Sequence, residues 1–164
     1  MYKRQFNNTK LFLGPGTGLG AAVSIDEIVF PTEIGNSLFA IPNLLLDIGL
    51  TSKTDINIIE DLISGGGLVK IYSHLAKTNK SSEEILNACH SDELAKKSVE
   101  LFLKSFSQIL SELALAFMPG KGIYLAGGLI RSLYEFLDTD DFIKNFVINR
   151  KSMHEEVLLQ MPIA

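Results

Sequence analysis

The sequence predicts an α/β fold in which a mixed sheet is flanked by helices, and two patterns carry this prediction. Three short apolar runs, separated by glycine-rich or acidic turns, open the chain, which is typical of an antiparallel meander. Further along, a long amphipathic segment leads into the apolar run 123–126, a second glycine turn and another helical pattern. Helix, strand, glycine turn and helix in this order are typical of α/β domains.

Composition limits the class of protein. The chain has 164 residues, of which 46% are hydrophobic and 21% charged, so we expect one globular core. Its net charge is −4 and it has no basic cluster, which does not support a nucleic-acid partner. Cys89 is the single cysteine, so internal disulfides and a cysteine-built zinc site are excluded. The chain has no signal-peptide pattern and no apolar run long enough for a bilayer. We therefore expect a cytoplasmic protein without a membrane partner.

The first half of the chain is expected to form strands over 10–13, 20–25 and 27–31, followed by short helices over 44–50 and near Ile56. Ser64 has the residue type of an N-cap, and the periodic apolar positions after it indicate a helix to about Lys77.

The second half is expected to be mainly helical. A short helix follows the acidic segment 81–84 and runs through Ala88, and Asp92 caps a long helix that runs to about Met118. The long helix carries one apolar stripe, formed by Ala95, Val99, Phe102, Phe106, Ile109, Leu113 and Phe117. After the strand at 123–126 we expect helices over 129–137 and 140–147, a connecting segment over 151–153 and the start of a strand over 161–164.

The glycine-rich segment 14–20 is the clearest chemical motif. It lies between two predicted strands, so it reads as a hairpin turn whose backbone N–H groups can approach an anion such as phosphate. Gly14, Gly16 and Gly18 supply the open backbone, and Thr17 supplies the hydroxyl. The segment has no lysine for a Walker A loop and lacks the spacing of a dinucleotide fingerprint. The alternative is a glycine-rich hairpin that binds no ligand.

Two further motifs carry polar or glycine residues at turns. Glu33 and Asn36 lie three residues apart in a loop after a strand, and Glu60 precedes the segment Ser-Gly-Gly-Gly at 64–67. Carboxylates and carboxamides are suited to the paired hydroxyls of a polyol. Gly127 and Gly128 follow a strand and open a helix, where N–H groups face the carboxyl end of the strand. Taken singly, Glu33 and Glu60 are also compatible with solvated surface positions, and Gly127 and Gly128 with an ordinary turn between a strand and a helix.

Taken in order, these motifs resemble the C-terminal domain of bacterial-type glucokinases, in the hexokinase group of the actin-like ATPase superfamily with its ribonuclease H-like fold. The resemblance covers nearly the whole chain. It implies that Gly14, Gly16, Thr17 and Gly18 bind the phosphates of ATP, with Gly127 and Gly128 at the nucleoside end. The residues it assigns to the sugar are Glu33, Asn36 and Glu60.

The chain departs from this family pattern in two respects. Asn36 stands where the family usually has histidine, which leaves the sugar preference open. The family's N-terminal domain, with its aspartate base, has no counterpart, so no catalytic residue is assigned in this chain and the isolated chain is expected to be inactive. We interpret 10–164 as a glucokinase C-terminal domain truncated at both ends, and 1–9 as a non-native leader.

The resemblance implies ATP-dependent phosphorylation of glucose to glucose 6-phosphate, a step of glycolysis, with ATP and Mg²⁺ as cofactors and no metal ligands in this chain. One alternative is a kinase for another hexose or an amino sugar, and a second is a non-catalytic sugar- or nucleotide-binding sensor. The helix from Asp92 to Met118 is long enough to contribute to the interface of a homodimer.

Overall fold

The structure is a computed structural model that describes residues 8–38, 41–50 and 54–164. Its centre is one mixed sheet in the order β3-β2-β1-β4, built from β1 (Thr9–Pro15), β2 (Leu19–Ile25), β3 (Ile28–Thr32) and β4 (Ile123–Leu125). β1 pairs antiparallel with β2 and parallel with β4, and β2 pairs antiparallel with β3. The predicted α/β class with antiparallel N-terminal strands is therefore confirmed. Of the predicted leader, residues 1–7 lie outside the described residues, and β1 begins at Thr9.

The sheet buries one face against the helices. Along β1, Leu11 and Leu13 are each 1% exposed and belong to the core, whereas Phe12 between them is 37% exposed. This alternation follows from the two-residue period of a strand. Phe12 stacks on Tyr124 of β4 with ring centroids 5.2 Å apart. The predicted start of a strand at the end of the chain is confirmed as a parallel bridge between Ile123 and Ile163.

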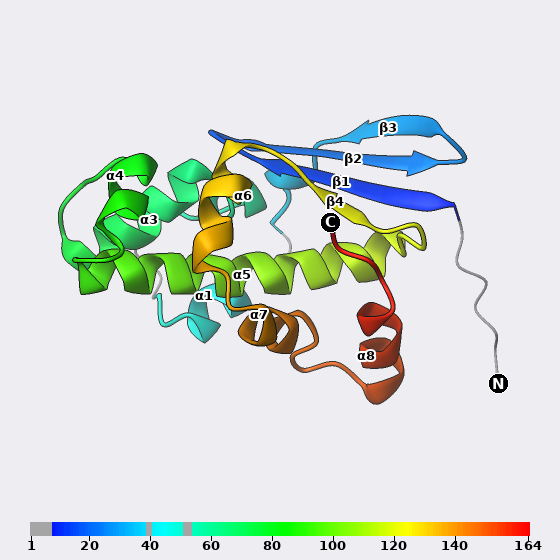
Figure 1. Cartoon of the computed structure of the whole chain (residues 1–164). Coiled ribbons are helices and arrows are strands. Elements are labelled where there is room, and N and C mark those ends of the chain that lie inside the picture. The colour runs from blue at the N-terminus through cyan, green and yellow to red at the C-terminus, as the bar shows by residue number, and fades with distance from the viewer. Residues whose placement is uncertain (1–7, 39–40, 51–53) are drawn as a thin grey trace.

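Helix α5 (Glu93–Phe117) contacts β1 and crosses beneath the sheet in Figure 1. The predicted stripe is confirmed, because its residues are buried except Phe117, which is half-buried. The predicted cap is also confirmed: Asp92 Oδ1 accepts the N–H groups of Leu94 at 2.9 Å and Ala95 at 3.1 Å. Met118 ends the helix in the left-handed conformation.

Most of the other helices pack against α5, and η marks a 3₁₀ turn. The other helices and turns are η1 (Ile34–Asn36), α1 (Ile41–Asp47), α2 (Ile59–Leu62), α3 (Gly65–Ala76), α4 (Ser82–Ala88), α6 (Gly128–Leu133), η2 (Tyr134–Phe136), α7 (Thr139–Phe146) and α8 (Ser152–Leu159). Three predictions need correction. The helix expected over 44–50 ends before Gly49, whose φ is +73°. The helix expected over 129–137 becomes a 3₁₀ turn after Leu133. Residues 152–153, which were expected in a connecting segment, are the first residues of α8.

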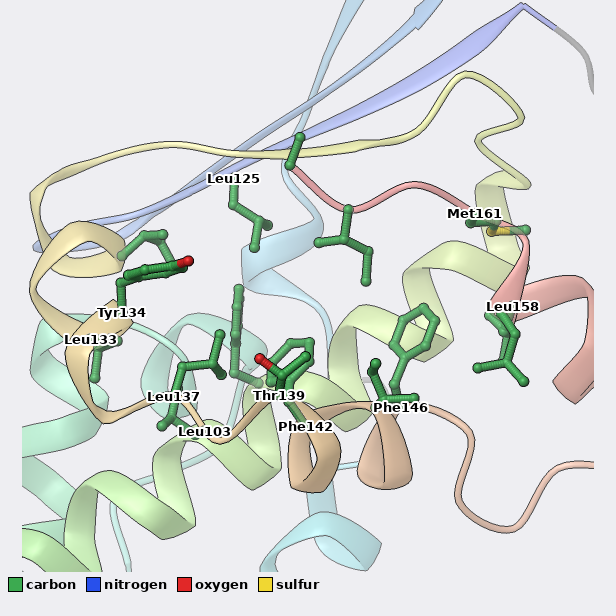
Figure 2. Close-up of a pocket in the computed structure, with 16 residues that line it drawn as sticks. Leu103, Leu125, Leu133, Tyr134, Leu137, Thr139, Phe142, Phe146, Leu158 and Met161 are labelled. Atoms are coloured by element: carbon green, nitrogen blue, oxygen red, sulfur yellow. The ribbon is translucent and has the colours of Figure 1, made fainter.

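An apolar cavity of about 580 Å³ opens below the end of β4 (Figure 2). It is lined by residues of β4, α5, α6, α7, α8, the turn after α6 and the last residues of the chain, among them Leu125, Phe142 and Met161. Among the residues that line it, Tyr134 and Thr139 are the ones with polar side chains. Such a lining is unsuited to phosphates or sugar hydroxyls, which need polar partners.

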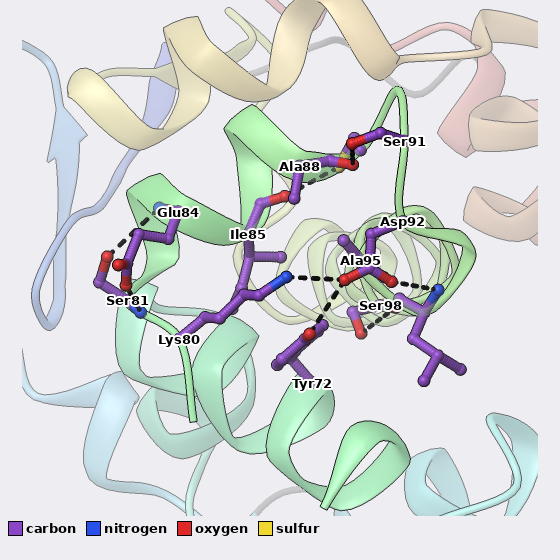
Figure 3. A network of polar contacts seen from close by, with 12 residues as sticks. Tyr72, Lys80, Ser81, Glu84, Ile85, Ala88, Ser91, Asp92, Ala95 and Ser98 are labelled. Atoms are coloured by element: carbon purple, nitrogen blue, oxygen red, sulfur yellow. Dashed lines mark hydrogen bonds and ion pairs between the residues drawn. The ribbon is translucent and has the colours of Figure 1, made fainter. Parts of the chain in front are cut away.

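A polar network ties α3 and α4 to the start of α5 (Figure 3). Asp92 Oδ2 accepts hydrogen bonds from Lys80 Nζ at 2.7 Å and from the hydroxyl of Tyr72 at 3.0 Å. The Lys80 contact and the N–H of Ala95 lower the pKa of the Asp92 carboxyl to about 2, and Asp92 in turn raises the pKa of Lys80 to about 12. One carboxylate thus caps α5 and fixes the connection between α3 and α4.

Candidate functional site

The tip of the β1–β2 hairpin is a three-residue turn, Gly16 to Gly18, that begins where β1 ends at Pro15. The N–H of Gly16 donates to the carbonyl of Gly18 at 2.7 Å and closes the turn. Thr17 is exposed at the tip. Within the part of the chain that the structure describes, the N–H groups of Thr17 and Gly18 donate to no protein acceptor. The turn therefore offers adjacent N–H donors and a hydroxyl to an anion.

The hairpin tip is fixed to the first turn of α3. Gly65 N–H, one of the N-terminal donors that a helix leaves unpaired, donates to the carbonyl of Gly16 at 2.7 Å. Ser64 caps the same helix, because its hydroxyl accepts the N–H of Gly67 at 3.2 Å. A Cβ at Gly65 would lie 3.1 Å from the Gly16 carbonyl oxygen, so a glycine here permits the close approach of the two segments.

Glu60 on α2 touches the hairpin from another side. Its Oε2 accepts the N–H of Leu19 at 2.7 Å. A Cβ built at Gly18 would lie 2.7 Å from the same oxygen, which is closer than real Cβ contacts come. Gly18 therefore leaves the room that the Glu60 carboxylate occupies in this position. Both residues were predicted from the sequence, but their contact was not.

Asp61 and Lys70 hold the segment that presents Glu60. Asp61 Oδ2 accepts the N–H groups of Asn57 at 3.0 Å and Ile58 at 3.2 Å, and Oδ1 pairs with Lys70. Partial burial raises the pKa of the Asp61 carboxyl, but the Lys70 contact and the two backbone N–H groups outweigh burial, so this pKa is lowered overall. This pair was not predicted from the sequence, because its members lie nine residues apart on two different helices.

Glu33 precedes the 3₁₀ turn η1 after β3, Asn36 is the last residue of that turn, and both are exposed. Asn36 Nδ2 donates to Glu33 Oε2 at 3.3 Å. Between them the buried Gly35 packs so that a Cβ would lie 3.3 Å from the carbonyl oxygen of Leu19 and 3.5 Å from the Cβ of Glu60. The structure thus brings the predicted sugar residues onto adjacent elements beside the start of β2.

Gly127 and Gly128 lie at the opposite side of the hairpin. β4 runs parallel to β1, and Ala126 N–H continues this pairing by donating to the carbonyl of Leu13 at 2.9 Å. Gly127 has φ +110°, a conformation that side chains disfavour, and its Cβ would lie 3.1 Å from the carbonyl oxygen of Pro15. Gly128 opens α6 with no neighbour within 4 Å of its Cβ position.

The predicted site residues therefore meet at one edge of the sheet, around the end of β1. Figure 1 shows the hairpin tip between α3 on one side and the start of α6 on the other. Ligands of open α/β sheets bind at this kind of place, beyond the carboxyl ends of parallel strands. The roles of the individual residues stay predictions. Among the described residues, no group of three or more His, Cys, Asp or Glu side chains could hold a metal ion, and no helix is long and apolar enough to cross a membrane.

Solved structures of sugar kinases share this mixed sheet with its flanking helices. The chain aligns over 99% of its length with 55% of a glucokinase from an Antarctic psychrotroph (TM-score 0.79, 22% identity). It aligns over 90% of its length with 53% of a ROK family glucokinase from Streptomyces griseus, solved in complex with glucose and AMPPNP (TM-score 0.64, 20% identity).

The sequence comparisons define the family. The glucokinase family model matches residues 2–164, and the chain belongs to this family. A glucokinase-like protein of Xylella fastidiosa, strain Temecula1, is 31% identical over 172 residues, which cover 94% of this chain and 50% of that protein. The chain thus spans about half the length of the curated relatives it matches.

Proposed function

We propose that this chain forms the sugar-binding half and one wall of the ATP site of a glucokinase, which transfers the terminal phosphoryl group of ATP to the 6-hydroxyl of glucose. The observation that carries the proposal is the meeting of the hairpin tip, Glu60 and the Gly127 turn at the end of β1. The Streptomyces griseus neighbour, which was solved with glucose and AMPPNP, supports this choice of ligands.

On the nucleotide side, the N–H groups of Thr17 and Gly18, which meet no acceptor among the described residues, and the Thr17 hydroxyl would donate to phosphate oxygens. Gly14, Gly16, Gly127 and Gly128 place no side chain beside this turn, and the space at Gly16 and Gly128 is open. Donors fixed in this way stabilise the charge that develops in phosphoryl transfer without reorganising during the reaction.

On the sugar side, Glu33, Asn36 and Glu60 would accept hydrogen bonds from glucose hydroxyls and hold the sugar in one orientation. Such positioning is a large part of catalysis in phosphoryl transfer. We assign no catalytic base in this chain. We expect Mg²⁺ to accompany ATP, but the described residues offer no carboxylate set for the ion, so we derive no step through it.

The first experiment measures binding and turnover separately. We expect the purified chain to bind AMPPNP and glucose in calorimetric titrations, and to show no ATP-dependent glucose phosphorylation in a coupled assay. Robust turnover by the chain would contradict the absence of a base, and failure to bind either ligand at millimolar concentration would contradict the proposed site.

Asn36 favours a second candidate, a kinase for another hexose or an amino sugar, because its amide both donates and accepts hydrogen bonds and cannot titrate. Binding of glucose, mannose and N-acetylglucosamine to the chain and to Asn36→His separates the two candidates. Glucose bound more tightly than the others supports the first. Preference for another sugar, lost in Asn36→His, supports the second.

A non-catalytic sensor would bind the sugar as well, so turnover by the longer protein containing this chain distinguishes that class. We also propose a cytoplasmic location, in keeping with one buried thiol, Cys89. Self-association through α5 stays a prediction, which sedimentation equilibrium would test.

A further inference from the structure

The carboxylate of Glu60 has two differently placed oxygens. Oε2 accepts the Leu19 N–H at 2.7 Å, at the point where β2 leaves the hairpin tip. Oε1 has no hydrogen-bond partner within the described residues. A hydrogen bond to a charged acceptor is about twice as strong as a neutral one, so the first oxygen ties the hairpin firmly to α2.

The backbone of Glu60 is itself fixed on the sugar side of the site. Ile59 N–H donates to the carbonyl of Ser37 at 3.0 Å, which joins α2 to the segment that carries Glu33 and Asn36. Asp61, which pairs with Lys70, accepts the N–H groups of Asn57 and Ile58 and so fixes the residues that lead into the same short helix. Since α2 is a single turn, its position depends on these contacts rather than on its own length.

We propose that Glu60 is a positioning residue for the phosphate-binding hairpin, and that through it a bound sugar strengthens nucleotide binding. The inference rests on the proposed function. A sugar hydroxyl that donates to Oε1 restricts the side-chain rotation of Glu60, and this restriction keeps Oε2 on the Leu19 N–H. The hairpin then holds its donors in place before the nucleotide arrives, so less conformational freedom is lost on binding.

The test compares Glu60→Ala with Glu60→Gln in the same chain. Glutamine keeps a carbonyl oxygen that can accept the Leu19 N–H, whereas alanine removes the acceptor. We expect Glu60→Ala to weaken AMPPNP binding in the absence of sugar by about tenfold, and Glu60→Gln by less. Glu156→Ala, an exposed acid on α8, controls for the loss of one negative charge and should leave AMPPNP affinity unchanged.

Two further readouts isolate the mechanism. Hydrogen exchange of the Leu19 amide should speed up in Glu60→Ala and not in Glu60→Gln, while the amide of Ala22 further along β2 keeps its rate. Saturating glucose should tighten AMPPNP binding to the wild-type chain and have no such effect in Glu60→Ala.

The two proposals fail in different ways. Unchanged AMPPNP affinity and unchanged Leu19 exchange in Glu60→Ala would overturn the role of Glu60 while leaving the proposed function intact. If the wild-type chain binds no AMPPNP, the proposed function and the coupling through Glu60 both fail. The hydrogen-exchange rate of the Leu19 amide in Glu60→Ala then still shows whether the Glu60 carboxylate holds the Leu19 N–H.

Discussion

Replacing Gly18 by alanine should break the contact between the hairpin and α2. The new Cβ would lie 2.7 Å from Glu60 Oε2 and 3.2 Å from its Cδ, so the carboxylate must rotate away. The Glu60 side chain is flexible and can rotate more easily than the backbone can shift, but this rotation breaks its hydrogen bond to the Leu19 N–H. Bonds to charged groups contribute about 1.5–3 kcal/mol, and this one is only partly buried, so we expect a loss of about 1.5 kcal/mol in the free energy of unfolding.

Gly20→Ala is the matched control. Its Cβ would lie 3.8 Å from the carbonyl oxygen of Gly14, an ordinary van der Waals contact. Both substitutions restrict the unfolded chain in the same way, so that effect cancels in the comparison. Urea unfolding followed by circular dichroism measures the free energy of each variant. We expect Gly20→Ala to stay within about 0.5 kcal/mol of the wild type.

A double-mutant cycle shows whether Glu60 is the cause. In a Glu60→Ala background the obstructing carboxylate is gone, so Gly18→Ala should cost almost nothing there. The reasoning is refuted if Gly18→Ala is as stable as Gly20→Ala. It is equally refuted if Gly18→Ala costs the same with and without the Glu60 side chain.

Three other predictions concern Gly127, Asp92 and Cys89. Gly127→Ala should destabilise the fold by about 1–3 kcal/mol, because φ at Gly127 is +110° and the new Cβ would lie 3.1 Å from the Pro15 carbonyl oxygen. Gly128→Ala should not destabilise the fold, because the space around its Cβ position is open. Thermal unfolding compares the two variants. Because the pKa of Asp92 is lowered to about 2 in the folded state, its contribution to stability is complete above its ordinary pKa of 3.8 and is lost as the pH falls toward 2. Asp92→Asn keeps a capping oxygen, so its stability should fall less than that of the wild type as the pH is lowered. An acid unfolding transition identical to that of the wild type would contradict this role of Asp92. Burial raises the pKa of the Cys89 thiol, so an aromatic disulfide reagent should label native protein far more slowly than unfolded protein at pH 8, and equal rates would contradict the burial of Cys89.

Much of the fold could be predicted from periodicity and caps. The stripe of α5, the cap at Asp92 and the meander of β1 to β3 are local signals, and each is confirmed. The ends of short helices were less predictable, because Gly49 in a left-handed conformation and the switch to a 3₁₀ turn after Leu133 depend on packing. Residues 152–153 were expected in a connection, yet α8 begins there without a side-chain cap that the sequence could reveal.

The positions of the site residues were predicted as a set of motifs, and the structure adds the contacts between them. No pattern in the sequence indicates that Leu19, an apolar residue, contributes its backbone N–H to Glu60, since backbone donors have no sequence signature. The Asp61–Lys70 pair was likewise hidden, because its residues meet across two helices rather than along one. Distance in space, rather than residue type, was the missing information.

Mapping ligand contacts by amide chemical shifts in ¹⁵N-labelled chain tests the central claim most directly. AMPPNP should shift the resonances of Thr17, Gly18, Gly127 and Gly128, and glucose should shift those of Glu33, Asn36 and Glu60. Shifts that cluster instead around the apolar cavity at Phe142, or no shifts with either ligand at millimolar concentration, would contradict the account.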